Sequence, residues 1–200
     1  MSMSFGRAAM AALVLAIAGP AIAQSYSDGY TFLKAVKERD AEKVTALVSR
    51  PGTIVVNTRD QGTGETALHT MVRARDYSWL SFLIGKGAKL DIQNNKGETP
   101  LSLAAQIGWT EAGELMLRRG ASVDLANRRG ETPLILAVQR GDVPMVRLLL
   151  RGGANVKKTD NVAGYSALDY ARQAGRSPAL LKLLEARANQ PARAAAGPKL

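Results

Sequence analysis

The residue types that most often carry catalysis or bind metal ions are scarce in this sequence. It contains one histidine, His69, and no cysteine. Zinc sites are built mainly from cysteine and histidine, so a zinc site here would depend on carboxylates alone. The sequence also lacks the G-x-S-x-G motif of serine hydrolases and the glycine-rich loop that binds phosphate groups. These observations argue against an enzyme and give no reason to expect a cofactor.

Three glutamates form the most regular set of ionisable residues. Glu65, Glu98 and Glu131 stand 33 residues apart, and each lies between a glycine and a threonine. Each precedes an expected helix start, where the helix dipole stabilises a negative charge. Stacked helical units lie about 10 Å apart, so the three side chains would form a row. We favour a structural role for the row; the alternative is that it forms one side of a partner-binding surface.

The glutamates belong to a repeat that runs along most of the chain. The segments GETALH, GETPLS, GETPLI and GYSALD begin at residues 64, 97, 130 and 164. A fixed period in this range is typical of a solenoid, in which each supersecondary unit buries its apolar face against its neighbours. Within each unit the residues predict a turn, a short helix, a tight turn and a second helix. The fold class is therefore predicted to be all-α.

Local signals mark where these helices begin and end. Thr99 and Thr132 are expected to cap first helices, because a threonine hydroxyl accepts a free backbone N–H, and each is followed by proline at the first helical position. Glycines are expected to end the first helices at Gly108, Gly141 and Gly175, and the second helices at Gly87, Gly120 and Gly153. The residues expected to face inward are Leu101, Leu103, Ala104, Leu134, Leu136 and Ala137.

Together these residues resemble the ankyrin repeat, whose pattern is G-x-T-P-L-H-x-A-A-x-x-G followed by a helix and G-A-x-V. The resemblance implies an ankyrin-repeat solenoid over residues 24–188, made of about five helix-turn-helix units with β-turn or hairpin tips. The units are predicted at about 28–63, 64–96, 97–129, 130–163 and 164–188. The first is degenerate and the last lacks Thr-Pro, as expected of a terminal cap. His69 occupies the histidine position of the motif, which implies hydrogen bonds to backbone that hold adjacent units together.

Four features depart from a regular repeat. Arg75 stands where the next two units have glycine, so the first turn of its unit is expected to differ. The connection over residues 50–64 is longer than its counterparts and leaves room for a protruding tip. Trp109 either anchors a partner or covers the groove between helices, and the sequence leaves both open. Trp79 lies on an apolar stripe and is expected in the core.

The resemblance also implies a binding function, because ankyrin domains generally bind proteins through the turn tips and the exposed side of the first helices. The matching tip residues are Gln93, Asn94, Asn95, Lys96, Ala126, Asn127, Arg128, Arg129, Asp160 and Asn161. The matching first-helix residues are Arg73, Gln106, Ile107, Gln139, Arg140, Arg172 and Gln173, with Trp109 beside them. Arginine, asparagine and glutamine suit a polar or acidic protein surface. The alternative is that these side chains only keep the surface soluble.

The two ends of the chain indicate where the protein works. Residues 1–23 have one charge, Arg7, an apolar run of 11 residues and a final Ala-Ile-Ala, which predicts a bacterial secretory signal peptide cleaved near Ala23. The run is shorter than the roughly 20 residues that span a bilayer, so no transmembrane segment is expected after cleavage. We expect a periplasmic or secreted protein. Residues 189–200 are rich in alanine and proline and predict a disordered basic tail.

The net charge of +10 falls to +9 (10 minus 1, for Arg7) in the cleaved protein and favours an acidic partner or surface. The leading hypothesis is a non-enzymatic scaffold that binds a protein. The alternatives are a charge-driven binder of an anionic envelope surface and a secreted effector that acts on host proteins. Nucleic acid is disfavoured, because no aromatic residues alternate with the basic ones to stack on bases.

Overall fold

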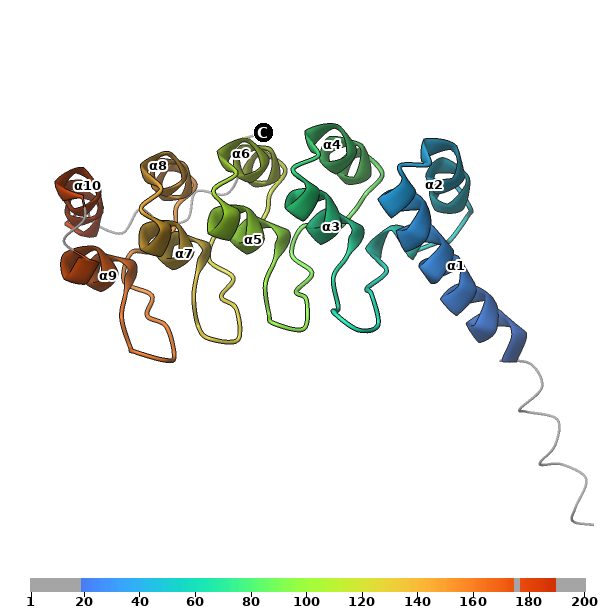
Figure 1. The fold of residues 1–200 in the computed structure, drawn as a ribbon, viewed down its shortest axis with the longest axis horizontal. Helices are drawn as coiled ribbons and strands as arrows, with labels where there is room; N and C mark the ends of the chain where they lie inside the picture. Colours follow the sequence, from blue (N-terminus) through green and yellow to red (C-terminus); the bar gives the residue numbers. More distant parts are fainter. Residues whose placement is uncertain (1–18, 175–176, 190–200) are drawn as a thin grey trace, which may run out of the picture. The chain divides into compact units, whose positions relative to one another are not determined.

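The computed structural model describes the backbone of residues 19–174 and 177–189, and the side chains of residues 28–173 and 177–189 (Figure 1). These residues fall into two compact parts, one ending at Thr58 and one beginning at Arg59, and each is described by itself. They contain ten α-helices, one short 3-10 helix and no β-strand beyond an isolated bridge between Thr159 and Ser166. The described residues confirm the predicted all-α fold.

The N-terminal part consists of two helices and the connection that follows them. Helix α1 (Gly19–Glu38) packs on α2 (Ala41–Val48), and Asp40 caps α2 by accepting the backbone N–H of Lys43 at 2.9 Å. The 3-10 helix η1 (Val55–Asn57) packs against both. The residues that form this small core are Phe32, Val36, Val44, Leu47, Val55 and Val56.

The N-terminal part departs from the sequence predictions in two ways. The long connection does not simply protrude, because Val55 and Val56 are buried in η1, although Ile54 before them is 80% exposed. Helix α1 begins nine residues before the predicted start of the first unit (28 minus 19) and runs across the predicted cleavage position after Ala23. Cleavage there stays a prediction, and the apolar run of residues 8–18 lies outside the described residues.

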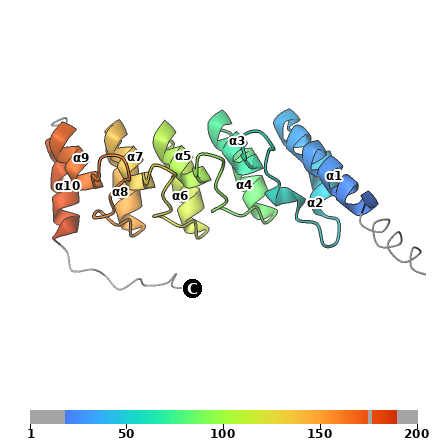
Figure 2. The ribbon, with the colours of Figure 1, turned by 90° about the horizontal axis from the view of Figure 1, so that it is seen from below.

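The C-terminal part contains four helix pairs, one in each predicted unit from residue 64 onward (Figure 1). The first helices, α3, α5, α7 and α9, form one row, and the second helices, α4, α6, α8 and α10, form another. The view from below shows the same order of pairs (Figure 2). The pairs are α3 (Ala67–Ala74) with α4 (Tyr77–Gly85), α5 (Pro100–Ile107) with α6 (Thr110–Arg118), α7 (Pro133–Arg140) with α8 (Val143–Arg151), and α9 (Ala167–Ala174) with α10 (Pro178–Ala188).

The helix boundaries follow the capping chemistry that the sequence predicted. Thr99 Oγ1 accepts the N–H of Ser102 at 3.1 Å, and Thr132 Oγ1 accepts the N–H of Ile135 at 3.3 Å. Gly108 and Gly141 end α5 and α7, and Gly87, Gly120 and Gly153 follow the second helices, all with positive φ. Gly175 lies outside the described residues. Asn189 ends α10, and the rest of the predicted basic tail also lies outside them.

Arg75 does not change the turn between α3 and α4, which corrects the expectation drawn from the sequence. Its φ of 50° and ψ of 38° place it in the same left-handed conformation as Gly108. Its guanidinium Nη2 donates to the backbone carbonyl of Ile107 at 2.6 Å, one unit further along. We infer that this bond and the packing of the helix pair hold arginine in a conformation that favours glycine.

The core of the C-terminal part lies between the two rows of helices. All six residues expected to face inward are buried, and Ala104 and Ala137 are completely so. Trp109 is also buried, so it covers the groove between helices and is not an exposed anchor. Trp79 is partly exposed and packs edge-on against Phe82, so its expected core position is wrong in part. Its counterparts are the smaller Ala112 and Met145, and the larger indole extends beyond the slot that they fill.

Candidate functional site

Successive tips are joined edge to edge by backbone hydrogen bonds, which we call the tip ladder. Its bonds run from Asn95 N to Thr63 O at 2.9 Å, from Arg128 N to Lys96 O at 3.0 Å, and from Asn161 N to Arg129 O at 2.8 Å. A glycine stands at the base of each tip because the next tip approaches closely: a Cβ on Gly97 would lie 2.7 Å from Arg128 N. The sequence reading missed the ladder, although the glycines at 64, 97 and 130 are a signal of it.

Inside each tip an asparagine and a glutamate lock the turn. Asn94 Oδ1 accepts the N–H groups of Lys96 at 2.8 Å and Glu98 at 3.0 Å, and its Nδ2 donates to Glu98 Oε2 at 2.8 Å. Asn127 makes the same three bonds in the next unit. Asn94 is only 5% exposed. These two asparagines therefore shape the tips, and we remove them from the predicted binding surface.

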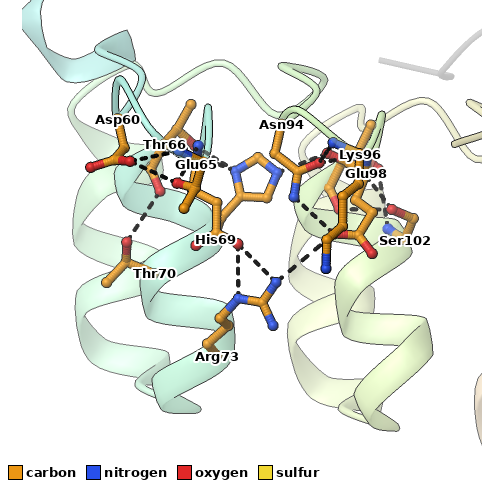
Figure 3. Close-up of polar contacts among 12 residues, drawn as sticks. Asp60, Glu65, Thr66, His69, Thr70, Arg73, Asn94, Lys96, Glu98 and Ser102 are labelled. Atoms are coloured by element: carbon orange, nitrogen blue, oxygen red, sulfur yellow. Dashed lines mark hydrogen bonds and ion pairs between the residues drawn. The ribbon is translucent and has the colours of Figure 1, made fainter. Parts of the chain in front are cut away.

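His69 performs the structural role that the resemblance implied (Figure 3). Its ring is completely buried; Nδ1 accepts the N–H of Thr66 at 3.2 Å, which leaves the proton on Nε2. Nε2 then donates to the carbonyl of Glu98 at 2.9 Å, in the next unit. Burial lowers the pKa of His69 below its ordinary value, more than the neighbouring backbone and glutamates raise it. The histidine is neutral at neutral pH and ties two units together.

The glutamate row lies close to arginine side chains (Figure 3). Arg73 Nη2 lies 2.8 Å from Glu65 Oε1 and 3.8 Å from Glu98 Oε2, so one guanidinium bridges two units. Further along, Arg129 Nη2 lies 3.6 Å from Glu131 Oε1. Glu98 and Glu131 are buried beneath these cations and bonded to the tip asparagines. The geometry favours the structural interpretation of the row.

Other predicted contact residues also serve the frame of the repeat. Gln93 Nε2 donates to the carbonyls of Gly97 at 2.7 Å and Ala126 at 2.9 Å, which links two units. Asn95 is exposed, but Nδ2 donates to Gly62 O at 2.9 Å and Oδ1 accepts from Arg59 at 3.2 Å. Trp109 is buried. We leave these three residues out of the binding surface for that reason.

Arg172 lies on a different face from the one predicted. The last unit carries one extra residue, so Arg172 stands six residues after its cap, Ser166, whereas Gln139 stands seven after Thr132. Gln173 is the true counterpart of Gln139. Arg172 Nη2 lies 3.6 Å from Glu185 Oε1 on α10. The insertion thus turns this arginine toward the second helix of its own unit.

The remaining predicted residues lie together on the tips and the first helices, and we call them the binding strip. All are exposed except Ile107, which is partly so: Arg73, Lys96, Gln106, Ile107, Arg128, Arg129, Gln139 and Arg140. Within the described part of the chain, the side chains of Lys96 and Arg128 contact no acidic residue within ion-pair distance. Arg140 Nε lies 4.0 Å from Asp142 Oδ2, at the limit of an ion pair.

The last tip contains a polar pair that sequence reasoning did not identify. Asp160 takes the place of the tip asparagine and accepts the N–H groups of Val162 and Ala163, both at 2.7 Å. The Tyr170 hydroxyl donates to Asp160 Oδ2 at 2.7 Å. Burial raises the pKa of Asp160, but these hydrogen bonds outweigh it and lower the pKa overall. The same hydrogen bond raises the pKa of Tyr170, so the pair closes the tip with a fixed negative charge.

Searches for other kinds of site within the described residues gave two results. No group of three or more histidine, cysteine, aspartate or glutamate side chains there is placed to hold a metal ion. None of the described helices combines the length and the apolar character needed to cross a bilayer.

The repeat architecture agrees with a comparison against protein families. A family model described as ankyrin repeats (3 copies) matches residues 32–127 and again residues 108–194. The two matches together extend over more than three-quarters of the 200 residues (32 to 194). The capped helix pairs, the histidine between units and the stacked tips lie within this matched region. This chain belongs to the ankyrin repeat family.

Proposed function

We propose that this protein is a non-enzymatic scaffold that works outside the cytoplasm and holds a protein partner on the binding strip. Ankyrin repeats generally mediate protein–protein interaction, and the family match covers both ends of the strip. The partner's identity is left open.

One observation carries the proposal: the polar residues of the repeat divide into two sets. His69, Asn94 and Glu98 are buried and bonded within or between units. Lys96 and Arg128, only a few residues away, are exposed and bind neither a neighbouring unit nor an acid with their side chains. Exposed arginines beside a fixed frame are typical of protein-binding surfaces, because the frame keeps them in place before the partner arrives.

The perturbed ionisable groups support the absence of catalysis in this proposal. Four groups have shifted pKa values, and each has a structural partner: His69 joins two units, Asp160 and Tyr170 close the last tip, and Asp169 accepts the N–H of Ser166 at 3.0 Å. Shifted groups that serve the fold in this way do not form a nucleophile with a base.

The proposed location rests on residues 1–23. Their single charge, short apolar run and small residues before Gln24 are typical of a secretory signal peptide. The absence of cysteine from the sequence fits an oxidising compartment. We therefore place the scaffold in the periplasm or outside the cell, and N-terminal sequencing of the protein recovered from a periplasmic fraction would test this directly.

The binding strip is tested by reversing two of its charges. We expect Arg128→Glu combined with Arg140→Glu to abolish capture of protein partners from a periplasmic extract, with the helical circular dichroism signal unchanged. The physical reason is that two cations on neighbouring units become acids that repel the bound surface. Captured proteins would be identified by mass spectrometry.

The matched control carries the same change in charge on the other row of helices. Arg147 and Arg151 are exposed on α8, among the second helices. Arg147→Glu with Arg151→Glu should leave capture intact. If both double variants lose capture equally, net charge and not the strip governs binding, and the alternative of a charge-driven binder of an anionic surface is favoured. If the strip variant still captures the partner, the strip is wrongly assigned.

A further inference from the structure

Acids and bases are not mixed evenly on the binding strip; the acids lie below and the cations lie above. The Arg73 side chain is 46% exposed, against 18% for Glu65 and 7% for Glu98 beneath it. The Arg129 side chain is 65% exposed, and that of Glu131 is 7% exposed. The carboxylate layer is also held from below, because Asn94 donates to Glu98 at 2.8 Å.

The same layering recurs at Arg140, whose side chain is 49% exposed, against 14% for Asp142. Asp142 cannot turn outward without leaving the start of α8, where its Oδ1 accepts the N–H of Met145 at 3.0 Å. The arginine is held only loosely, at 4.0 Å, and Lys96 and Arg128 have no acid at ion-pair distance among the described residues. A molecule that settles on the strip therefore meets cations that are free to reorient toward it.

The spacing of these cations follows the spacing of the units. Lys96 and Arg129 hold equivalent positions in neighbouring tips, 33 residues apart, and the tip ladder keeps those tips in register. Neighbouring helices pack about 8–10 Å apart. An extended peptide advances about 3.3 Å per residue, so every third side chain meets the next unit. A helical peptide advances 1.5 Å per residue and would need about seven residues for the same step.

We propose that the partner presents an extended acidic segment to the binding strip, with carboxylates about every third residue. This inference rests on the proposed scaffold function and gives the chemistry of its partner. Arginine is suited to the task, because its planar guanidinium can bind a carboxylate with two parallel hydrogen bonds.

Two other anionic partners fit the strip less well. A flat lipid surface in contact with the tips would stand away from Arg73 and Arg140, because the tips project from the row of first helices on the side away from the second helices (Figure 1). A single-stranded nucleic acid is commonly held by aromatic side chains that stack on its bases, and the strip contains none. An extended polypeptide can follow the tips and reach down to the first helices.

The inference is tested with labelled peptides in a fluorescence anisotropy titration of the purified protein. The first peptide has glutamate at every third position with serine and threonine between. The second has the same composition with the glutamates in one block, and the third has lysine in place of glutamate. We expect the first to bind most tightly, the second several-fold more weakly and the third not at all, with binding of the first falling as salt rises.

Two variants of equal charge locate the bound peptide. Lys96→Gln with Arg129→Gln should weaken binding of the first peptide roughly tenfold to thirtyfold, if each exposed ion pair contributes up to about 1 kcal/mol. Arg147→Gln with Arg151→Gln, on α8, should change it less than about twofold. Circular dichroism of each variant checks that the fold is kept. Because all four side chains are exposed, we expect no loss of helix.

Three results would overturn the inference: equal binding of the glutamate and lysine peptides, block binding at least as tight as spaced binding, or equal weakening by the two variants. The peptide assay needs no natural partner, so its outcome is separate from that of the extract experiment. A captured partner that binds the strip without any acidic segment would sink the inference and leave the scaffold function standing.

Discussion

At the scale of single residues, one slot of the repeat shows how different side chains serve one structural need. The slot lies three residues after each first-helix cap and is filled by His69, Ser102, Ile135 and Asp169. His69 Nδ1, Ser102 Oγ and Asp169 Oδ2 each accept the backbone N–H of their cap residue, at 3.2, 2.8 and 3.0 Å. Of the three, only histidine also has a ring nitrogen that donates to the next unit, to Glu98 O.

The buried His69 makes stability depend on pH. Its pKa is lowered in the folded protein, chiefly by burial, so the unfolded chain binds more protons below the ordinary histidine value of about 6.5. The contribution is therefore fully present above that value and is lost as pH falls through it. We expect the free energy of unfolding, measured by urea titration, to decrease from about pH 7.5 to about pH 5.5.

His69→Ser provides the control, because Ser102 shows that serine fills the equivalent slot and keeps the helix cap. The variant should be less stable at pH 7.5 by about 1–3 kcal/mol, since the carbonyl of Glu98 loses its buried donor. It should also lose most of the dependence on pH in this range. An unchanged dependence in the serine variant would show that another group is responsible.

At the scale of the helices, the turn between first and second helix is built the same way in successive pairs. Arg75, Gly108 and Gly141 all adopt positive φ, and the backbone N–H that follows each turns back to the helix just ended. For arginine this conformation is strained, whereas glycine adopts it freely. Arg75 gains the hydrogen bond to Ile107 O in exchange.

Two substitutions at residue 75 separate strain from hydrogen bonding. Both Arg75→Ala and Arg75→Gly remove the bond to Ile107, but only glycine relieves the positive φ. We therefore expect the glycine variant to be more stable than the alanine variant by about 0.5–1 kcal/mol, measured by chemical denaturation. Equal stabilities would mean that the turn rearranges in at least one of the variants.

At the scale of the whole repeat array, each unit of the C-terminal part depends on its neighbours in three ways. Leucine and alanine side chains pack between successive first helices, and the tip ladder joins the turns. The loops after the second helices also bond across units: Asp91 Oδ1 accepts the N–H of Ser122 at 3.0 Å, and Asp124 that of Asn155 at 3.1 Å. Stability should therefore reside in the interfaces between units as much as within them.

A central leucine tests this dependence on interfaces. Leu134 is completely buried at the start of α7, which packs on α5, α8 and α9. We expect Leu134→Ala to lower the free energy of unfolding by about 2–5 kcal/mol, because it removes buried methyl groups and leaves a cavity. Gln106→Ala, exposed on the binding strip, should change it by less than about 0.5 kcal/mol. A loss below about 1 kcal/mol for Leu134→Ala would contradict the register of the repeats.

The sequence by itself determined the period, the helix pairs, the caps and the role of the single histidine. Each depends on residues close together in the chain: a threonine cap bonds three residues ahead, and a glycine ends its own helix. Such short-range rules are the same wherever the unit lies, so a repeating pattern reveals them. The helices α3 to α8 were predictable for this reason, as was the burial of Leu101 and Leu134.

Only the tertiary structure decided which recurring polar residues belong to the frame and which face a partner. Asn94 and Lys96 are two residues apart, yet one is buried in its turn and the other is exposed. Gln93 bonds to Ala126, 33 residues away, and one extra residue in the last unit turns Arg172 toward α10. These outcomes depend on how close the next unit comes, and that distance is set by packing between units rather than by any local pattern.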